Sequence, residues 1–514
     1  KPIAGAEILV SGGPNWDRRS SPAAFTKTST RADGTYILNL PVGHYILTPT
    51  KVGRASASGP SSVEITTGAA PRIVPLTLTR ESVVRIAVTE EDALTSVPLP
   101  SKITFISKPG TMPIHWGYGP GINQGIGNVH YMPYGAAVIP VTPGRYQITI
   151  SRGIEYGIRH GELTVVPGSD NKLHFTLPHA LKGELQGMIS VDIGVMTTAS
   201  AVGTASPADR VVQAVAEGVQ VIVTGDYDVA TDLQPEINRL GLGRHIKAFP
   251  GMRLLLVKDD MRANVLMYPL TQELAARIKA FVDKNRDLPP DVVISDLRRE
   301  FPNVILQIDS PLDPQQGYLM PFAFDDIFDE FEDGVMPPPD FDAIQIVEGK
   351  KWPLVGPMMA RYKELAMART REQGAPPLSG TGGSSSRLAF GEEVGYPRTY
   401  VYTSNDTVEK FTAEDLVRAI RGQHYVVTNG PVLTLSVYNP KTGQFDARPG
   451  DVVDYSSTST LQVKINVLAA PWVPFSNFDV LFNGSPVDKT EVMPTTRVLR
   501  YPVQANPDTA IRQI

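Results

Sequence analysis

The chain of 514 residues contains no cysteine, which excludes disulfides, thiolate metal sites and cysteine nucleophiles. Histidine is scarce, with eight residues, six of which lie before residue 180. No apolar stretch is long enough for a transmembrane helix, so we expect a protein that does not span a membrane. The net charge of −5 and the lack of a basic run argue against a nucleic-acid partner. Neither a Gly-x-Ser-x-Gly elbow nor a P-loop occurs, so serine-nucleophile chemistry lacks support.

Glycine and proline are plentiful, with 44 and 45 residues, and hydrophobic residues make up 42% of the chain. This composition and length predict a multidomain protein with several cores, in which all-β domains accompany an α/β domain. The absence of cysteine also suits an oxidising compartment. No signal peptide is visible and the chain opens within a strand-like stretch, so we expect a processed or trimmed form.

Three parts of the chain show the alternation of apolar and polar residues that is typical of β-strands. Residues 1–80 contain turns at Asp33-Gly34 and Pro41-Val42-Gly43, predict a small β-sandwich, and resemble the carboxypeptidase regulatory-like domain, an extracellular Ig-like module. Residues 81–182 predict a second β-sandwich, interrupted by a glycine-rich surface loop at 116–128. Residues 431–514 predict a C-terminal β-sandwich. Strand candidates in the second part are 82–89, 102–107, 136–141, 145–151 and 162–166.

Residues 183–430 instead alternate strands and helices. A strand that ends near Val195 is followed by Ser206 and Pro207, which predict the start of a helix, and by an apolar strand at 219–224. This order predicts a right-handed βαβ unit with parallel strands. The chemistry of such units lies past the C-terminal ends of the strands, here at 192–196 and 225–228.

This unit resembles the PHP (polymerase and histidinol phosphatase) superfamily of metal-dependent phosphoesterases and hydrolases, in its carbaryl-hydrolase-like branch. That family has Asp-x-His-x-His after the first strand and Asp-His-Asn after the second. Here the two motifs are Asp192-Ile193-Gly194-Val195-Met196 and Asp226-Tyr227-Asp228, so both aspartates remain and all three histidines are replaced. The resemblance implies a distorted (β/α) barrel flanked by Ig-like β-sandwiches.

The replacements continue in later segments of the resemblance. Arg253 stands at the family's Glu position, Arg262 at a His position, and Asp309-Ser310 at Asn-His. Ser384-Ser385-Ser386-Arg387 stands where the family has Ser-Asp-Ser-His. The resemblance therefore implies a degenerate metal site, with no catalytic residue, no metal ligand set and no cofactor. The predicted vestigial cleft consists of Asp192, Gly194, Met196, Asp226, Tyr227, Arg253, Arg262, Asp309 and Ser310.

The surviving carboxylates leave two interpretations. Asp192, Asp226, Asp228 and Asp309 could hold one hard cation such as Mg²⁺ or Ca²⁺. Alternatively they pair with Arg253 and Arg262 as a salt-bridge plug, which we favour because a buried arginine needs an anionic partner.

Two more segments are interpreted as loops. Residues 374–386 predict a flexible loop rich in glycine and serine. Residues 324–334 carry six carboxylates between Asp325 and Asp333, interleaved with Phe324, Phe328 and Phe331. A solvated acidic loop and a partner-binding loop both remain open for this segment.

The function favoured by the sequence is that of a catalytically inactive pseudoenzyme. We expect an extracytoplasmic binding or structural subunit of a protein assembly, with other protein subunits as partners. One alternative is a metal-dependent hydrolase of the phosphoesterase or esterase class with an atypical acid-rich site. Another is an anionic small-molecule or carbohydrate-binding protein that uses the old cleft, where the two arginines grip an anion.

Overall fold

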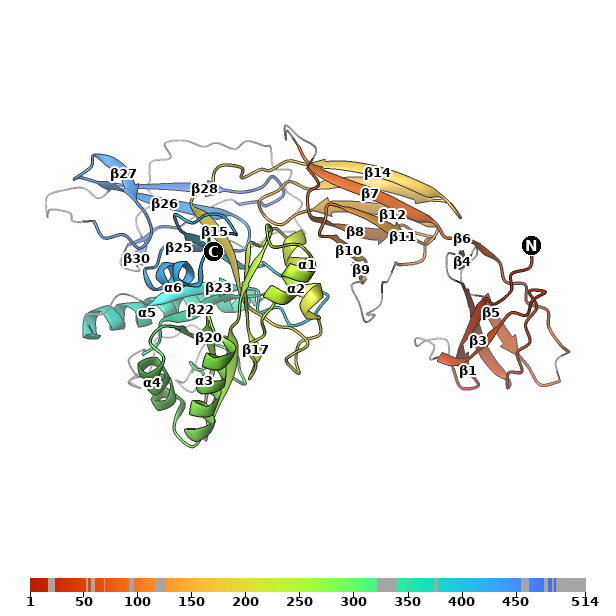
Figure 1. Cartoon of the computed structure of the whole chain (residues 1–514), viewed down its shortest axis with the longest axis horizontal. Coiled ribbons are helices and arrows are strands. Elements are labelled where there is room, and N and C mark those ends of the chain that lie inside the picture. The colour runs from red at the N-terminus through yellow and green to blue at the C-terminus, as the bar shows by residue number, and fades with distance from the viewer. Residues whose placement is uncertain are drawn as a thin grey trace.

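The computed structural model describes most of the chain and places its strands in several separate sheets (Figure 1). The described residues are 1–16, 24–51, 54–56, 61–68, 70–91, 97–114, 116, 125–320, 340–349, 351–373, 378–453, 462–475, 479–482 and 485–486. In this part of the chain, no helix has the length and apolar character needed to cross a membrane. The acidic segment at 324–334 lies outside the described residues.

The N-terminal residues form a four-stranded antiparallel sheet in the order β2-β1-β3-β5. Its strands are β1 (Glu7–Gly13), β2 (Ala24–Ser29), β3 (Gly43–Thr50) and β5 (Ser61–Ile65). Ile8 and Val10 of β1 pack against Tyr45 and Leu47 of β3, because alternate residues of both strands face one side. A short ribbon of β4 (Arg54–Ser56) and β6 (Leu78–Arg80) follows. This module stands at one end of the molecule in Figure 1.

The next region consists of two sheets that share one core. One sheet has the order β11-β7-β14 and the other β13-β12-β8-β10-β9. The five strand candidates of the sequence all occur, whereas β14 is an additional strand whose Leu173, Phe175 and Leu177 alternate. At the end of the predicted 116–128 loop, Gly125–Ile126 forms the short strand β9. The strands are β7 (Val83–Glu90), β8 (Ser101–Ser107), β9, β10 (Val129–Met132), β11 (Ala136–Pro140), β12 (Gly144–Ser151), β13 (Arg159–Val165) and β14 (Asp170–Leu177).

Residues 188–428 contain a five-stranded and a six-stranded sheet, with helices on their outer faces (Figure 1). The first has the order β18-β16-β15-β24-β25, and the second β17-β19-β20-β21-β22-β23. The strands are β15 (Met188–Val195), β16 (Val221–Thr224), β17 (Asp226–Tyr227), β18 (Lys247–Phe249), β19 (Met252–Lys258), β20 (Met261–Tyr268), β21 (Ile305–Ile308), β22 (Ala343–Glu348), β23 (Ser379–Gly383), β24 (Arg398–Tyr402) and β25 (Tyr425–Thr428).

The predicted βαβ unit is confirmed. β15 and β16 are parallel neighbours, and α1 (Pro207–Ala216) connects them. Ser206 caps α1, since its hydroxyl accepts a hydrogen bond from the backbone N–H of Asp209 at 3.1 Å. The Asp209 carboxylate accepts in return from the Ser206 N–H, which completes a capping box.

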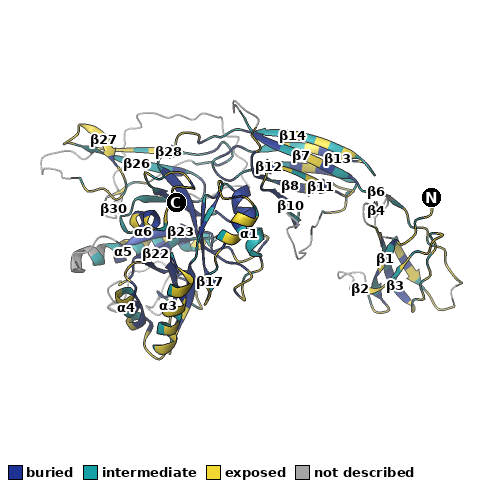
Figure 2. Cartoon of the chain, in the orientation of Figure 1, coloured by how far each residue is buried: buried dark blue, intermediate teal, exposed yellow. Residues whose placement is uncertain are grey.

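The remaining helices cover the sheets with amphipathic faces. Ile278 of α3 and Val293 and Leu297 of α4 are buried on the six-stranded sheet, while the outer side of α3 is exposed (Figure 2). This one-sided burial matches the 3.6-residue period of their apolar positions. The helices are α2 (Gln234–Arg239), α3 (Gln272–Lys284), α4 (Pro290–Glu300), a 3₁₀ turn (Trp352–Leu354), α5 (Val355–Gln373) and α6 (Ala413–Arg421).

The expectation of a flexible loop at 374–386 is wrong for its central part. Ser379–Gly383 is the fully buried strand β23, and residues 374–377 lie outside the described residues. The glycines serve close packing here: a Cβ on Gly383 would lie 2.0 Å from the carbonyl oxygen of Ile193 in β15. Thr399 of β24 also donates to the Gly382 carbonyl at 2.8 Å. The six-stranded sheet therefore abuts the five-stranded sheet along β23, where a Cβ at Gly382 or Gly383 would clash with a neighbouring strand.

The last described strands pack back on the preceding regions. β26 (Val432–Asn439) lies between β27 (Gln444–Ala447) and β28 (Val463–Leu468), and β29 (Leu481–Phe482) pairs with β30 (Ser485–Pro486). Trp472 donates its indole N–H to the Tyr156 carbonyl at 2.7 Å, which ties the C-terminal part to the end of β12 and its following turn. The second β region, the α/β region and the C-terminal strands therefore contact one another.

Candidate functional site

Three aspartates predicted for the vestigial cleft are fully buried at the strand ends, and each has a separate set of partners. Asp192 in β15 accepts the backbone N–H groups of Ser384, at 2.7 Å, and of Gly395. Burial raises the pKa of Asp192 to about 6 despite these donors. Its carboxylate thus joins β15 to the two segments that flank Arg387, through main-chain N–H groups and the Ser384 side chain.

Asp226, at the start of β17, fixes the two loops that follow β15 and β17. One carboxylate oxygen accepts the Thr197 N–H at 2.7 Å, and the other accepts the hydroxyls of Thr197 at 2.8 Å and Thr231 at 2.6 Å. A carboxylate that accepts this many donors is satisfied without a metal ion. Thr197 and Thr231 were not identified from the sequence, although each lies within five residues of a predicted site residue.

Arg253 of β19 occupies the middle of the site. It is 1% exposed, and its Nε donates to Asp309 at 2.7 Å, with a second contact from Nη2 to the same carboxylate. Its Nη1 donates to the Gly225 carbonyl at 2.8 Å. Although burial opposes it, Asp309 holds the pKa of Arg253 above its ordinary value. The predicted pairing of Arg253 with a surviving aspartate is confirmed.

Gly194 and Tyr227 shape the space that the guanidinium fills. Gly194 has φ +87°, and a Cβ there would lie 2.8 Å from Nη2 of Arg253. The Tyr227 ring lies 5.6 Å from the guanidinium carbon, a cation–π contact. The Tyr227 hydroxyl donates to Gln316 at 2.9 Å. A glycine and an aromatic ring at two positions of the predicted cleft therefore make room for an arginine.

Ser310 and Met196 also lie near these strand ends, and their backbone groups make their main hydrogen bonds. Ser310 has φ +46° and donates its N–H to Gln345 at 3.1 Å, and Ser385 across the site has φ +45°. Left-handed backbone at a residue other than glycine is strained and clusters at functional sites. The Met196 carbonyl accepts from Nε of Arg210 at 2.7 Å.

Arg210 of α1 is a second buried arginine that sequence reasoning missed. It is fully buried, and burial lowers its pKa to about 10. Besides Met196 it contacts Ser386, donating to the hydroxyl at 2.8 Å and to the carbonyl at 3.0 Å. The signal in the sequence was an arginine directly beside the apolar stripe of Val211, Val212 and Val215.

Arg262, a predicted cleft residue, and Asp228, one of the surviving carboxylates, lie outside this cluster. Arg262 is exposed and donates to the Gln315 carbonyl at 2.7 Å, so its expected pairing with a site aspartate is wrong. The reason is the β19–β20 hairpin, which places Arg262 opposite Val257, four residues along the strand from Arg253. Asp228 is also turned outward, with its side chain 61% exposed and paired with Lys279 at 3.4 Å.

The arrangement does not fit a metal cluster. In the described ranges, no three His, Asp or Glu side chains come together as possible ligands. A divalent cation beside the Arg253 guanidinium would also be repelled, since arginine stays protonated and has no lone pair to donate.

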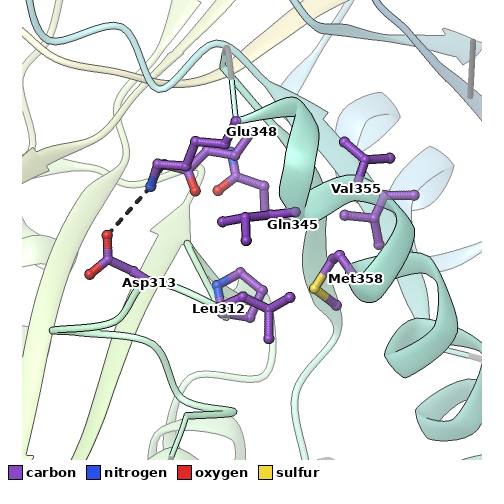
Figure 3. A pocket seen from close by; sticks show the side chains of 10 residues that line it. Leu312, Asp313, Gln345, Glu348, Val355 and Met358 are labelled. Atoms are coloured by element: carbon purple, nitrogen blue, oxygen red, sulfur yellow. Dashed lines mark hydrogen bonds and ion pairs between the residues drawn. The ribbon is translucent and has the colours of Figure 1, made fainter. Parts of the chain in front are cut away.

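A small hollow lies beside the site, between β22 and α5. Figure 3 shows Leu312, Gln345, Val355 and Met358 around it, with Asp313 at its edge. Lys351 spans the edge, because its ammonium lies 3.4 Å from Asp313 and 2.9 Å from Glu348. The hollow has a volume of about 20 Å³, which is room for a single water. It therefore offers no space for a substrate.

Comparison with known proteins gives remote similarities. No protein-family profile matches the chain, and no curated protein matches it. Endonuclease Q of Pyrococcus furiosus is 11% identical over 47% of this chain and 57% of its own, with a TM-score of 0.31. The chain thus spans less than two thirds of that protein.

Two other solved structures illustrate the range. A two-domain protein of Bacteroides vulgatus with a predicted PHP-like metal-dependent phosphoesterase is 10% identical over 55% of this chain and 87% of its own, with a TM-score of 0.30. The minor pilin GBS52 of Streptococcus agalactiae is 14% identical over 35% and 84%, with a TM-score of 0.22. Proteins with PHP-like modules are therefore among the similar structures, at TM-scores that establish no shared function.

Proposed function

We propose that the chain is a catalytically inactive PHP-like pseudoenzyme that acts as an extracytoplasmic binding or structural subunit of a protein assembly. The observation that carries this proposal is the position of Arg253. Its guanidinium lies among the ends of β15, β17 and β21, paired with Asp309 and bonded to Gly225. Hydrolysis in such a site requires a metal to lower the pKa of a bound water. A cation already fills that position, and it cannot be a Lewis acid.

The finer assignment of the fold belongs to the same proposal. We take the two sheets of residues 188–428 as a distorted barrel of the PHP kind, because β23 abuts β15 on one side and β16 continues through Gly225 into β17 on the other. The shared motif order of the sequence supports the carbaryl-hydrolase-like branch. The paired sheets around it would be Ig-like sandwiches, and the N-terminal sheet a carboxypeptidase regulatory-like module.

The two alternative functions, a hydrolase and an anion-binding protein, each require several charged side chains to face one common space. A hydrolase with an acid-rich site needs several carboxylates around one metal, whereas Asp192, Asp226 and Asp309 each hold different protein donors. An anion site needs both arginines to face one space, whereas Arg253 is buried and Arg262 is exposed. Both alternatives therefore have less support than the pseudoenzyme.

An extracytoplasmic role rests on the composition. A chain without cysteine has no thiol to oxidise, and its β-rich modules resemble extracellular ones. Fractionation of the native source tests this part of the proposal. We expect to detect the chain outside the cytoplasm. Recovery of the chain with cytoplasmic marker proteins would contradict this part of the proposal.

Hydrolysis assays test the loss of catalysis. The full chain is incubated with phosphodiester, carboxylic ester and carbamate substrates in added Mn²⁺ or Zn²⁺, beside an Asp226→Ala variant. We expect the same background rate with both proteins. Metal-dependent turnover that the Asp226→Ala variant lacks would overturn the proposal.

A further inference from the structure

One edge of the six-stranded sheet lies open beyond β17. β17 pairs with β19 only at Met252 and Arg253. The chain then turns away at Asp228, which has φ +60° and whose N–H donates to the Arg253 carbonyl at 2.9 Å. From Leu254 to Lys258, β19 therefore has β20 on one side and no other strand of the described residues on its second side.

The alternation of the ladder shows which backbone groups face outward. The Asp309 N–H donates to the Asn264 carbonyl at 2.8 Å, so the polar groups of Asn264 point toward β21. Asn264 lies opposite Leu255 in the antiparallel pairing of β19 and β20. Because hydrogen-bonded and non-bonded pairs alternate, the N–H and C=O of Leu255 point away from β20, as do those of Val257. Two donors and two acceptors thus line the open edge.

The side chains from Leu254 to Val257 lack the usual protection against pairing. Natural edge strands carry charges, proline or bulges that prevent association with another strand. Here the edge consists of Leu254, Leu255, Leu256 and Val257, and the charged Lys258 follows at its end. Leu255 is 39% exposed and Val257 45%, while the other two are buried in the core. An apolar strand with free backbone groups is a template for a further strand.

A groove beside the edge adds a place for one face of such a strand. Its volume is about 310 Å³, and Val282, Leu288 and Val293 line it from α3, α4 and their connection. The charges at its rim already pair with each other. Lys279 lies 3.4 Å from Asp228, and Arg286 lies 2.5 Å from Asp283. The groove therefore favours an uncharged, apolar side chain.

We propose that β19 is a docking edge for an extended segment of a partner protein. The segment would add as a strand beside Leu255 and Val257, through backbone hydrogen bonds, and place an apolar side chain in the groove. Apolar residues at alternate positions are required, because successive side chains of a strand face opposite sides. This inference rests on the proposed function, since it names the class of partner that the subunit binds.

A second copy of this chain fits the edge less well. In a two-fold pairing of two β19 strands, the side chains directed to the groove side would be Leu254 and Leu256 of the second copy. Both are buried in their own core, with exposed fractions of 2% and 5%. They cannot fill a groove on another molecule, whereas a partner segment can.

The test uses the full chain and a fluorescent synthetic peptide of alternating valine and threonine with lysine at each end. Fluorescence anisotropy should show saturable binding. Val257→Lys should weaken it at least about tenfold, because a charge at the edge opposes strand addition and lost hydrogen bonds leave the peptide unpaired. Val138→Lys is the matched control, since Val138 is 53% exposed on β11, which is also an edge strand.

Two further arms test the backbone pairing itself. Leu255→Pro removes an outward N–H but no bond to β20, and should also abolish binding. Peptides N-methylated at alternate amides should bind in one methylation register and fail in the other. Circular dichroism of each variant should match that of the wild type.

Three outcomes would overturn the docking edge: no saturable binding, equal binding by wild type and Val257→Lys, or self-association that Val257→Lys abolishes. The last outcome would assign the edge to a second copy. Metal content and hydrolysis do not depend on this edge, so its failure would leave the loss of catalysis untouched. Conversely, metal-dependent turnover would overturn the pseudoenzyme proposal, whereas peptide binding at the β19 edge would be unaffected.

Discussion

At the scale of single residues, the site is held together by buried hydrogen bonds and one buried ion pair. Arg253 and Asp309 are both buried, with side chains 1% and 0% exposed, so each charge depends on the other. Such a pair is strongly coupled: loss of one member leaves the other uncompensated, whereas joint replacement by apolar residues is often tolerated. Gly194 is needed for the same pair, because a residue without Cβ leaves room for the Arg253 guanidinium at a φ of +87°.

The Arg253→Ala variant should lose about 3–5 kcal/mol of unfolding free energy, because Asp309 would remain buried and unpaired. Chemical denaturation followed by tryptophan fluorescence measures the loss. Arg262→Ala is the matched control and should change stability little, because Arg262 is exposed. Equal effects of the two substitutions would mean that Arg253 is not a buried plug.

At the scale of elements, strand β23 lies in close contact with strands of the other sheet. Gly382 and Gly383 of β23 approach β25 and β15, and a Cβ on either would lie within 2.3 Å of another atom. These glycines allow the close contact because they have no side chain. Substitution at such a contact forces the backbone apart, whereas an open helical position gains from the change.

Gly383→Ala should therefore destabilise the chain by about 1–3 kcal/mol or more. Gly356→Ala in α5 should be neutral or slightly stabilising, because nothing lies within 4 Å of its added Cβ and alanine favours a helix. Melting temperatures of both variants check this contrast. A Gly383→Ala variant as stable as Gly356→Ala would contradict the close seam between the sheets.

The sequence predicts elements better than contacts here. Periodicity was sufficient for β15, α1, β16 and the five strands of the second region, because each buries one face or lies wholly inside. It failed at β23, whose Ser379–Gly383 is polar and glycine-rich yet fully buried, since that burial depends on a distant strand. The resemblance located Arg253 but misplaced Arg262, because the hairpin register places Arg262 opposite Val257, four residues along the strand from Arg253. The boundaries of the four domains remain predictions.

At the scale of the whole molecule, buried polar contacts join the second β region to the α/β region. Lys102 of β8 lies 2.5 Å from Glu217 at the end of α1, and Glu217 is 1% exposed. Arg152 donates to the carbonyls of Pro100 at 2.6 Å and Val215 at 2.8 Å. Tyr400 donates to Glu155 at 2.7 Å. Buried polar contacts of this kind fix the orientation of neighbouring regions.

Lys102→Ala should destabilise the protein by about 3–5 kcal/mol, because it leaves the buried Glu217 carboxylate without its cationic partner. Lys108→Ala is the control, since its partner Glu162 is 79% exposed. Exposed pairs contribute little, so this variant should unfold almost as the wild type does. Differential scanning calorimetry compares the two, and similar traces would contradict a rigid junction.

The same junction should respond to acid. Burial of Glu155 raises its pKa, but His179, Arg398 and Tyr400 outweigh that effect and hold the pKa below its ordinary value of 4.5. A carboxylate with a lowered folded-state pKa contributes stability above its unfolded pKa and loses it as the pH falls through the folded value. Glu155→Gln should thus flatten the loss of stability below pH 4.5. An unchanged pH profile in this variant would contradict the assignment.

The most direct test of the pseudoenzyme is metal analysis of the full chain. Protein purified without chelators, then exposed to Mn²⁺ and Zn²⁺ and desalted, is measured by inductively coupled plasma mass spectrometry. We expect transition metal well below one ion per chain, and no increase in Arg262→Ala, which leaves the plug intact. Two or more tightly bound transition-metal ions per chain, lost in Asp226→Ala, would contradict the account.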